Sequence, residues 1–458
     1  MCGLVGIYGV PEAAKYTYFG LFALQHRGQE GAGIAVFNGK RIVEYKNLGL
    51  VSEAFNEKIL QELAGDIAVG HVRYSTTGAS VLQNVQPFCV KYSKKTLALA
   101  HNGNLVNAYA LRCELEEEGH IFQTTLDSEV IIHLIVKYLK EGLVYAIAKT
   151  MKRIKGAYSV LLLCDDLLVA FRDPWGFRPL ALGILNGGYA LASETCAFDL
   201  LGAEYLRDVA PGEILVIDSN GPKSFLPFEE DPQPLSHCIF EFVYFARPDS
   251  FVFQKNVYLV RKNLGYNLFK ECPLSADFVM PLPDSGTYAA LGYSQASGLP
   301  LEFGVIRNHY IGRTFIQPSE KLRDLSVKMK LNPVKEFIRG KEVIVVDDSL
   351  VRGTTSKNRI RSIRLAGAKK IHFLISCPPL RYPCFFGIDF PQARELIASK
   401  HSVEEIRKFL DIDTLYYLSL EGLLDSVGEL RDKVCLACFT GNYPLEVDFS
   451  FRKDITEI

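Results

Sequence analysis

Residues 343–355, with the sequence VIVVDDSLVRGTT, determine how the second half of the chain is expected to fold. Four β-branched apolar residues predict a buried strand, which ends at the paired acids Asp347 and Asp348. Small and hydroxyl residues follow, and a helix is expected to begin near Thr355. A strand, a short loop and a helix in this order are typical of a parallel sheet covered by helices, which binds ligands at the carboxyl ends of its strands.

This loop has the chemistry to hold a phosphorylated sugar. Backbone N–H groups of the loop and of the helix N-terminus favour a phosphate, and the hydroxyls of Ser349, Thr354 and Thr355 can add donors. The two acids can hold sugar hydroxyls or a hydrated Mg²⁺. A solvated strand-to-helix turn would explain the paired acids alone, but not the whole string. The string also lacks the GxxxxGK[ST] pattern of a Walker loop.

The segments around this loop predict an α/β domain with a mostly parallel sheet. Further short strands are expected at residues 277–281, 301–306, 342–346 and 371–375, with helices such as 287–296 and 355–366 between them. An acidic, proline-rich stretch at 227–234 is the best candidate for a linker. We therefore expect one domain over residues 2–230 and a second over 231–458.

The first of these domains is predicted to be a layered α+β structure. A strand is expected at residues 3–8, and hairpins with Asn-Gly tips at 35–43 and 181–193. Residues 104–118 and 128–141 have helical periodicity.

Composition narrows the class of protein. The chain has 458 residues and a formal net charge of −1, which suits two domains and argues against a bulk nucleic-acid or membrane-surface binder. It contains no run of eighteen apolar residues, and its first residues lack the basic region and apolar core expected of a signal peptide. Eleven scattered cysteines do not form a secreted disulfide pattern, so we expect a cytoplasmic protein.

Cys2 would be the first residue once Met1 is removed, and no further processing is expected. A free α-amine titrates near ~8, so at neutral pH it can accept the proton of the adjacent thiol. A buried, inert cysteine would be the better interpretation of an isolated Met-Cys-Gly.

Four further motifs change that interpretation of Cys2. They are HRGQEGAG (26–33), HVRYST (71–76), HNGNL (101–105) and LDSE (126–129). As a set they resemble the glutaminase domain of the N-terminal-nucleophile class II amidotransferases. The resemblance implies an αββα domain in which Cys2 forms a glutamyl thioester and releases ammonia.

The resemblance also implies roles for the other residues of these motifs. Arg73 would bind the α-carboxylate of glutamine and Asp127 its α-ammonium, although a structural ion pair is the alternative for both. Asn102 and Gly103 would stabilise the oxyanion. Arg27 and Thr76 would shape the glutamine pocket.

Residues 343–355 resemble the signature of the type I phosphoribosyltransferases, which bind phosphoribosyl pyrophosphate (PRPP). By that resemblance Asp347 and Asp348 face the ribose and Mg²⁺, and Ser285, in the turn 283–286, lies near the metal. The 5′-phosphate would be held by Ser349, Arg352, Gly353, Thr354 and Thr355. A solvated surface loop is one interpretation of the basic segment 312–332. The resemblance favours a mobile lid whose cations, Lys330 among them, lie on the pyrophosphate.

Cys435 and Cys438 form a CxxC motif, which by itself is compatible with redox, zinc or iron–sulfur chemistry. Over nearly its full length the chain resembles the amidophosphoribosyltransferase family, one branch of which carries a [4Fe–4S] cluster. That resemblance implies Cys238, Cys384, Cys435 and Cys438 as ligands, and a structural role for the cluster. Zinc would also accept four cysteines.

The resemblance implies that glutamine, PRPP and water give 5-phosphoribosylamine, glutamate and pyrophosphate, the opening step of purine synthesis. It also implies homo-oligomers and inhibition by purine nucleotides. His309 lies at an expected nucleotide-binding position where the family more often has Arg.

Three alternative functions compete with this one. An asparagine-synthetase-like enzyme would need an SGGxDS loop, which the sequence lacks. A PRPP sensor would not need the glutaminase set, and an iron–sulfur electron carrier would need neither pocket.

Overall fold

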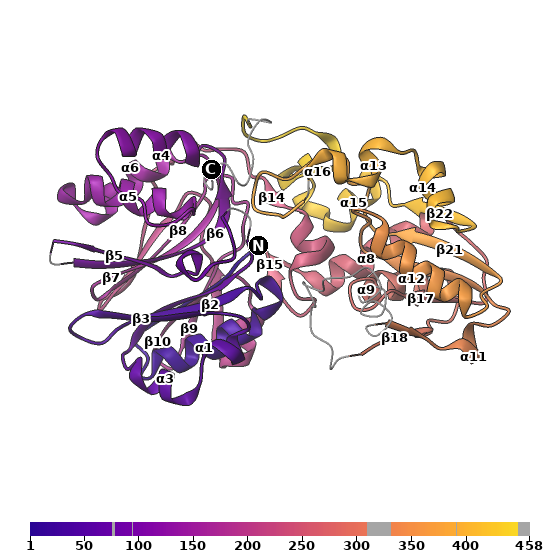
Figure 1. Cartoon of the computed structure of the whole chain (residues 1–458), viewed down its shortest axis with the longest axis horizontal. Coiled ribbons are helices and arrows are strands. Elements are labelled where there is room, and N and C mark those ends of the chain that lie inside the picture. Colours follow the sequence, from indigo (N-terminus) through magenta and orange to yellow (C-terminus); the bar gives the residue numbers. More distant parts are fainter. Residues whose placement is uncertain (76–77, 94, 309–330, 391, 448–458) are drawn as a thin grey trace.

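A computed structural model describes residues 1–75, 78–93, 95–308, 331–390 and 392–447. It contains two domains that lie side by side, as Figure 1 shows. The N-terminus lies between them. A short parallel ladder pairs β14 (His237–Cys238) with β23 (Val434–Cys435). The segment predicted as a linker, 227–234, is a loop without helix or strand.

The first domain is built on two antiparallel sheets. The first sheet has the strand order β11-β9-β10-β1-β4-β2-β3. Its strands are β1 (Gly3–Tyr8), β2 (Gly31–Phe37), β3 (Ile42–Leu48), β4 (Ile67–Arg73), β9 (Ala181–Leu185), β10 (Gly188–Ala192) and β11 (Glu204–Asp208). The second sheet has the order β13-β12-β8-β7-β6-β5. Its strands are β5 (Phe88–Tyr92), β6 (Lys95–Leu105), β7 (Gly156–Cys164), β8 (Leu167–Arg172), β12 (Ile214–Asp218) and β13 (Gly221–Phe225).

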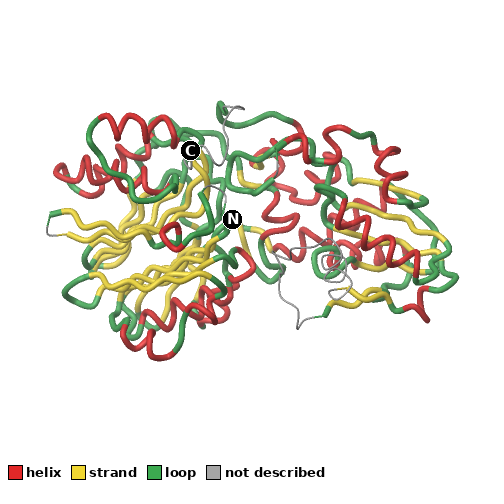
Figure 2. Tube along the Cα trace, in the orientation of Figure 1, coloured by secondary structure: helices red, strands yellow, loops and turns green. Residues whose placement is uncertain are grey.

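The two sheets pack face to face around a fully buried apolar core that includes Leu4, Val69, Leu161 and Leu182. Helices cover the outer face of each sheet, as Figure 2 shows on the left. The first sheet is covered by α1 (Ala13–Ala23), α2 (Val51–Ala54), α3 (Glu57–Glu62) and α7 (Cys196–Leu201). The second is covered by α4 (Ala108–Glu117), α5 (Ser128–Tyr138) and α6 (Leu143–Arg153). The predicted αββα layering is therefore confirmed.

The second domain contains a parallel sheet in the order β17-β20-β21-β22. Its strands are β17 (Phe278–Pro281), β20 (Glu342–Asp347), β21 (Lys370–Ile375) and β22 (Thr414–Tyr417). The longer helices of the domain are α8 (Val257–Glu271), α9 (Thr287–Ser297), α12 (Thr354–Leu365), α14 (Val403–Leu410) and α15 (Leu420–Val427). The predicted mostly parallel sheet is confirmed.

One expected strand, 301–306, is not a continuous member of this sheet. Leu301 forms only an isolated parallel bridge with Val279. The chain then turns away, and β18 (Val305–Arg307) pairs antiparallel with β19 (Leu331–Pro333). Pro300 lacks the N–H that a ladder needs, and Gly304 weakens the strand between the two halves of the segment.

Shorter elements complete the chain. They are a π-helix at Glu241–Phe245, the hairpin of β15 (Phe251–Val252) and β16 (Lys255–Asn256), and the helices α11 (Lys335–Ile338), α13 (Ile397–Lys400) and α16 (Ala437–Thr440). Short 3₁₀ turns lie at Gln25–Arg27, Leu82–Asn84, Leu139–Glu141, Ala393–Glu395 and Gly428–Lys433. Within the described residues, none of these helices has the length and apolar character to cross a membrane.

Candidate active site

Cys2 lies immediately before β1 and is buried between β4 and β6. Its backbone N–H donates to Asn102 Oδ1 at 3.1 Å, and its Sγ lies 3.5 Å from both the backbone nitrogen and the carbonyl oxygen of Tyr74. Met1 precedes it and is itself buried. Burial, with a contribution from Arg178 and Arg27, lowers the pKa of the Met1 amino group to about 4. The Met1 amino group is therefore neutral at physiological pH.

Asn102 and Gly103 lie next to each other on β6, opposite β7. The Asn102 side chain is fully buried, and its Nδ2 has no hydrogen-bond partner among the described residues. A buried donor without a partner costs about 1–3 kcal/mol, so this amide is suited to an acceptor that arrives with a substrate. Gly103 has no room for a side chain, since a Cβ there would lie 1.9 Å from the Ala157 carbonyl oxygen.

Arg73 and Asp127, which are expected to bind the amino-acid part of glutamine, come from β4 and from the segment before α5. Arg73 ends β4, is 2% exposed, and donates through Nη2 to the carbonyls of Gly78 and Ala79 at 3.0 and 3.1 Å. Asp127 precedes α5, and its Oδ2 accepts from the Leu105 N–H at 2.9 Å. Among the described residues no ion pair joins Arg73 to Asp127, so the structural pair considered for them is not observed there. Thr76 lies outside the described residues.

Arg27 lies against the backbone of Cys2 rather than in open space. Its Nε donates to the Cys2 carbonyl oxygen at 3.0 Å, and its Nη2 lies 2.8 Å from Glu241 Oε1. A second ion pair joins its Nη1 to Glu194, and all three side chains are fully buried. Burial raises the pKa of Glu194, but His26 and Arg27 outweigh burial and hold that pKa well below its usual range. Glu241 belongs to the second domain, so this network joins the two domains at the nucleophile.

In the second domain, the predicted loop lies at the carboxyl end of β20. Asp347 and Asp348 are 2% and 5% exposed. Burial, followed by the neighbouring Asp348 carboxylate, raises the pKa of Asp347 well above its usual range. Arg359 Nη1 lies 3.6 Å from Asp347 Oδ2. Two adjacent buried carboxylates are costly, and a bound cation would offset that cost.

The turn 283–286 approaches the same strand end from β17. Ser285 Oγ donates to Asp347 Oδ1 at 3.3 Å, and a Cβ on Gly286 would lie 2.2 Å from the Val346 carbonyl oxygen. The two predicted loops of the PRPP site therefore meet. Lys330 and the predicted lid up to that residue lie outside the described part of the chain.

The loop after β20 ends at Gly353, which precedes α12 with a φ of 80°. Ser349 Oγ donates to Asp348, and Arg352 Nη2 forms an ion pair with Glu395 at 2.8 Å. Thr354 and Thr355 are exposed at the start of α12. This helix N-terminus has the free N–H groups expected of an anion site.

The four cysteines expected to bind metal line one small cavity at the junction of the domains. Cys238 on β14 lies directly opposite Cys435 on β23, Cys438 lies on α16, and Cys384 Sγ accepts from the Phe386 N–H at 3.4 Å. Burial raises the pKa of Cys238 to about 11. Within the described ranges, however, no group of three or more His, Cys, Asp or Glu has side chains already arranged around a metal position.

Three features of this region were not predicted from the sequence. Glu194 and Glu241 form the buried network with Arg27; the only signal for Glu241 was an acid inside the apolar run 239–245. The third is Glu30, which accepts hydrogen bonds from the Ser75 N–H and hydroxyl at 3.1 and 2.9 Å and thereby holds the segment after Arg73.

Known proteins resemble this chain closely. Residues 71–199 match a family model described as a glutamine amidotransferase domain. An amidophosphoribosyltransferase of Methanocaldococcus jannaschii is 49% identical over 98% of both chains, and the chloroplastic amidophosphoribosyltransferase 1 of Arabidopsis thaliana is 50% identical over 97% of this chain and 79% of its own. The glutamine PRPP amidotransferase of Bacillus subtilis, solved with ADP and GMP, is 48% identical and superposes with a TM-score of 0.92 over 98% of both chains.

Proposed function

The chain belongs to the amidophosphoribosyltransferase family, and we propose that its two domains divide the family's reaction between the Cys2 site and the Asp347 site. The reaction converts glutamine, PRPP and water into 5-phosphoribosylamine, glutamate and pyrophosphate, which is the step that opens purine synthesis. The division is supported by the buried Cys2–Asn102 pair, which places a nucleophile beside an unused donor in the first domain.

In the first domain, the α-amine of Cys2 acts as the base once Met1 has been removed. A free α-amine titrates near neutral pH, so it can take the thiol proton and later give it to the departing nitrogen. The sulfur attacks the amide carbon, ammonia leaves, and water hydrolyses the thioester to glutamate. Arg27 contributes by fixing the Cys2 carbonyl oxygen, which holds the nucleophile in place.

Four residues of the first domain hold the oxyanion and the α-carboxylate and α-ammonium groups of glutamine. Asn102 Nδ2 and the Gly103 N–H donate to the tetrahedral oxyanion. The Arg73 guanidinium takes the glutamine α-carboxylate, and the Asp127 carboxylate takes the α-ammonium. Thr76 completes the pocket, by family resemblance alone.

In the second domain, the loop from Ser349 to Thr355 holds the 5′-phosphate of PRPP. Asp347, Asp348 and Ser285 would hold Mg²⁺, whose charge would match the buried acids and the leaving pyrophosphate. The acids also orient the ribose hydroxyls. Arg352 holds the loop from outside through Glu395, and Lys330 is proposed as a lid cation on the pyrophosphate.

Cys238, Cys384, Cys435 and Cys438 are proposed as the ligands of a [4Fe–4S] cluster. The support is that all four thiols line one cavity and come from three separate segments that meet at the domain junction. Buried thiols of raised pKa stay protonated without a cation, so the cluster would supply the charge that holds them as thiolates. Its role would be to join these segments.

The proposal extends to the chain's partners and location. Because a relative was solved with ADP and GMP, we propose that purine nucleotides bind here and inhibit the enzyme. Family resemblance alone supports the proposal that the chain forms homo-oligomers. His309, expected at the effector site, lies outside the described residues. A cytoplasmic location is supported by the eleven cysteines, none of which forms a disulfide.

The proposal is tested by a coupled assay on purified enzyme. Cys2→Ala should lose PRPP-dependent glutamate release, while added ammonia should still give pyrophosphate. Loss of both activities in a folded Cys2→Ala variant would contradict two separate sites. Iron and sulfide analysis tests the cluster, with Cys435→Ser compared with Cys113→Ser outside the cavity; stoichiometric zinc without iron would rule out the iron–sulfur assignment.

A further inference from the structure

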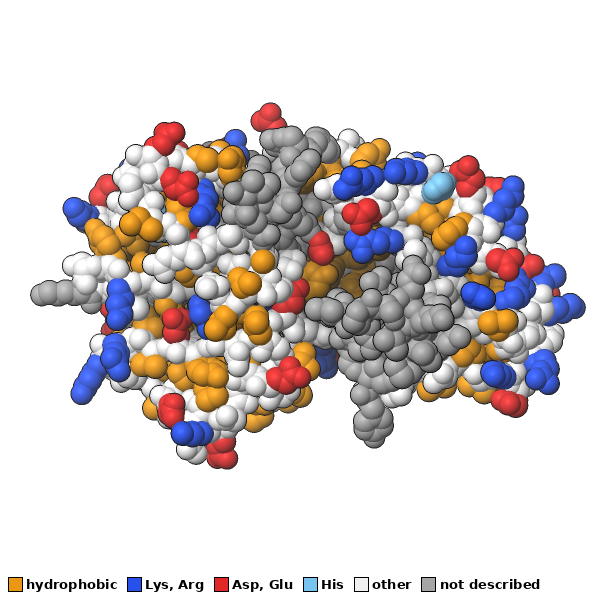
Figure 3. All heavy atoms as spheres, in the orientation of Figure 1, with side chains coloured by type: hydrophobic (Ala, Val, Ile, Leu, Met, Phe, Trp, Pro, Cys, Tyr) orange, Lys and Arg blue, Asp and Glu red, His pale blue; other side chains and the backbone are white. Residues whose placement is uncertain are grey.

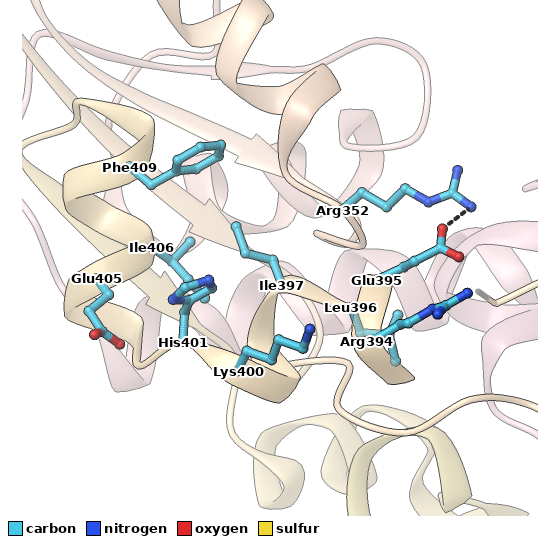
Figure 4. Close-up of a pocket in the computed structure, with 10 residues that line it drawn as sticks. All are labelled: Arg352, Arg394, Glu395, Leu396, Ile397, Lys400, His401, Glu405, Ile406 and Phe409. Atoms are coloured by element: carbon cyan, nitrogen blue, oxygen red, sulfur yellow. Dashed lines mark ion pairs between the residues drawn. The ribbon is translucent and has the colours of Figure 1, made fainter. Parts of the chain in front are cut away.

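A second cavity lies behind the phosphate loop, on the outer side of the second domain. It has a volume of about 310 Å³ and is drawn in Figure 4. Its walls come from the loop residue Arg352, the turn before α13, α13 itself and α14. Neither substrate site described above includes α13 or α14. The cavity is at the lower end of the size range of small-molecule sites.

One side of this cavity is apolar. Leu396, Ile397, Ile406 and Phe409 line it. Figure 4 shows Ile397 in the middle, between the side chains of α14 and the Arg352–Glu395 pair. A flat apolar group would find a matching surface here.

The polar part of the lining has an excess of positive charge. Arg352, Arg394, Lys400 and His401 line the cavity with only two acids, Glu395 and Glu405. In Figure 3, Lys and Arg side chains gather over the upper right of this domain, where Figure 1 places α13 and α14.

Both acids already have partners. Glu395 pairs with Arg352 at 2.8 Å, and Glu405 accepts from the N–H and hydroxyl of Ser402 at 2.7 and 2.9 Å in a capping box. Arg394, Lys400 and His401 have no ion pair among the residues that the structure describes. These three side chains can donate to a ligand, and they lie beside apolar residues. The cavity is therefore suited to binding an organic anion.

The cavity is in direct contact with the phosphate loop. The Ile397 N–H donates to the Val351 carbonyl oxygen at 2.9 Å. A Cβ added to Gly353 would lie 2.7 Å from Ile397 Cδ1 and 3.3 Å from Phe409 Cε1, so the loop rests on the cavity wall. Arg352 belongs to both.

We propose that this cavity is a binding site for a small organic anion with a flat apolar part, distinct from the two substrate sites. The anionic group lies among Arg394, Lys400 and Arg352, and the apolar part lies against Ile397 and Phe409. An occupant that pairs with Arg352 displaces Glu395, which frees the loop and raises the KM for PRPP. This last consequence rests on the proposed phosphate loop, whereas binding itself does not.

The probe for this site is 8-anilinonaphthalene-1-sulfonate, which joins a flat apolar part to a sulfonate. It is titrated by fluorescence into the full chain with PRPP and Mg²⁺ present and glutamine absent. The Arg394→Gln/Lys400→Gln variant should bind at least tenfold more weakly. The Lys369→Gln/Lys408→Gln variant, which loses the same charge at exposed positions outside the cavity, should bind as the wild type does.

Two comparisons complete the test. The uncharged N-phenyl-1-naphthylamine should bind more weakly than the sulfonate; equal binding of both probes, or equal binding to all variants, would overturn the anion site. In the steady-state assay, the sulfonate should raise the KM for PRPP at least twofold in the wild type and not in Arg394→Gln/Lys400→Gln. Binding at the cavity with an unchanged KM would overturn the coupling through Arg352 while leaving the proposed function intact.

Discussion

Asn104 Nδ2 donates a hydrogen bond to the Phe385 carbonyl oxygen at 2.9 Å, across the boundary between the two domains. Asn104 follows the proposed oxyanion residues on β6, and Phe385 follows the proposed cluster ligand Cys384. Beside this bond, a Cβ on Gly387 would lie 3.1 Å from the Gly103 carbonyl carbon. The loop that carries Cys384 therefore packs directly against the proposed oxyanion site.

Asn104→Ala should lower glutamine-dependent activity and leave ammonia-dependent activity unchanged. Removing the bond costs about 1 kcal/mol and loosens the contact between the loop and β6. Both activities are measured on the same preparation. Asn107→Ala is the control, since Asn107 makes two hydrogen bonds within the first domain, to Arg153 and Lys155. An equal effect of the two substitutions on glutamine-dependent activity would contradict a role for the interdomain bond.

Asn102→Ala should reduce kcat for glutamine hydrolysis by roughly 10²–10³-fold, the usual effect of removing one oxyanion donor. The KM for glutamine should change little, because Nδ2 contacts charge that develops only in the transition state. Steady-state glutamate release gives both values. A large rise in KM with an unchanged kcat would instead mean that Asn102 binds the substrate itself.

Much of this arrangement could be predicted from the sequence, because it depends on local pattern. The hairpins at 35–43 and 181–193 follow from Asn-Gly turns between apolar runs, and the strand and helix around Asp347 follow from periodicity. The helix predicted from residue 104 begins only at Ala108, because Asn104 and Leu105 extend β6. The end of β6 at Leu105 is set by its pairing with β7, which no local sequence pattern indicates.

The residues that join the domains could not be predicted in this way. In the sequence, Glu241 is a single acid in an apolar run, which gives no indication of its partner. Only the fold brings it to Arg27, 214 positions earlier in the chain. The Gly103–Gly387 contact likewise depends on how the domains pack. Motifs identify chemistry that lies along the chain, whereas contacts across a domain boundary depend on packing that has no period in the sequence.

Asp347→Asn should abolish PRPP-dependent activity and yet stabilise the metal-free protein, by roughly 0.5–2 kcal/mol at neutral pH. Burial and Asp348 raise the pKa of Asp347. A carboxyl whose pKa is raised by folding gives its full stability below the unfolded pKa of ~3.9 and loses it as the pH rises through the folded value. The Tm difference between variant and wild type should therefore be small near pH 4 and grow towards pH 8.

The control for this experiment is Asp411→Asn. Asp411 is exposed at the end of α14 with a φ of 57°, a conformation that Asn also tolerates. The Tm difference between Asp411→Asn and the wild type should not grow with rising pH. Mg²⁺ should narrow the difference between wild type and Asp347→Asn, since it offsets the buried charge only where the charge exists. A difference that does not change with pH would refute the proposed cost of ionising Asp347.

Arg27→Lys should separate the two tasks that the structure gives to Arg27. A lysine keeps the charge between Glu194 and Glu241, but its single ammonium cannot also reach the Cys2 carbonyl oxygen as the guanidinium fork does. Glutamine hydrolysis should therefore fall at least tenfold while the ammonia-dependent reaction continues.

Arg172→Lys is the matched control. Arg172 is also fully buried in the first domain, but it donates to the Val209 and Gly176 carbonyls, away from Cys2. Both variants lose a guanidinium and should lose similar amounts of Tm. If Arg172→Lys reduced glutamine hydrolysis as much, the effect would come from weaker packing of the domain and not from the position of Cys2.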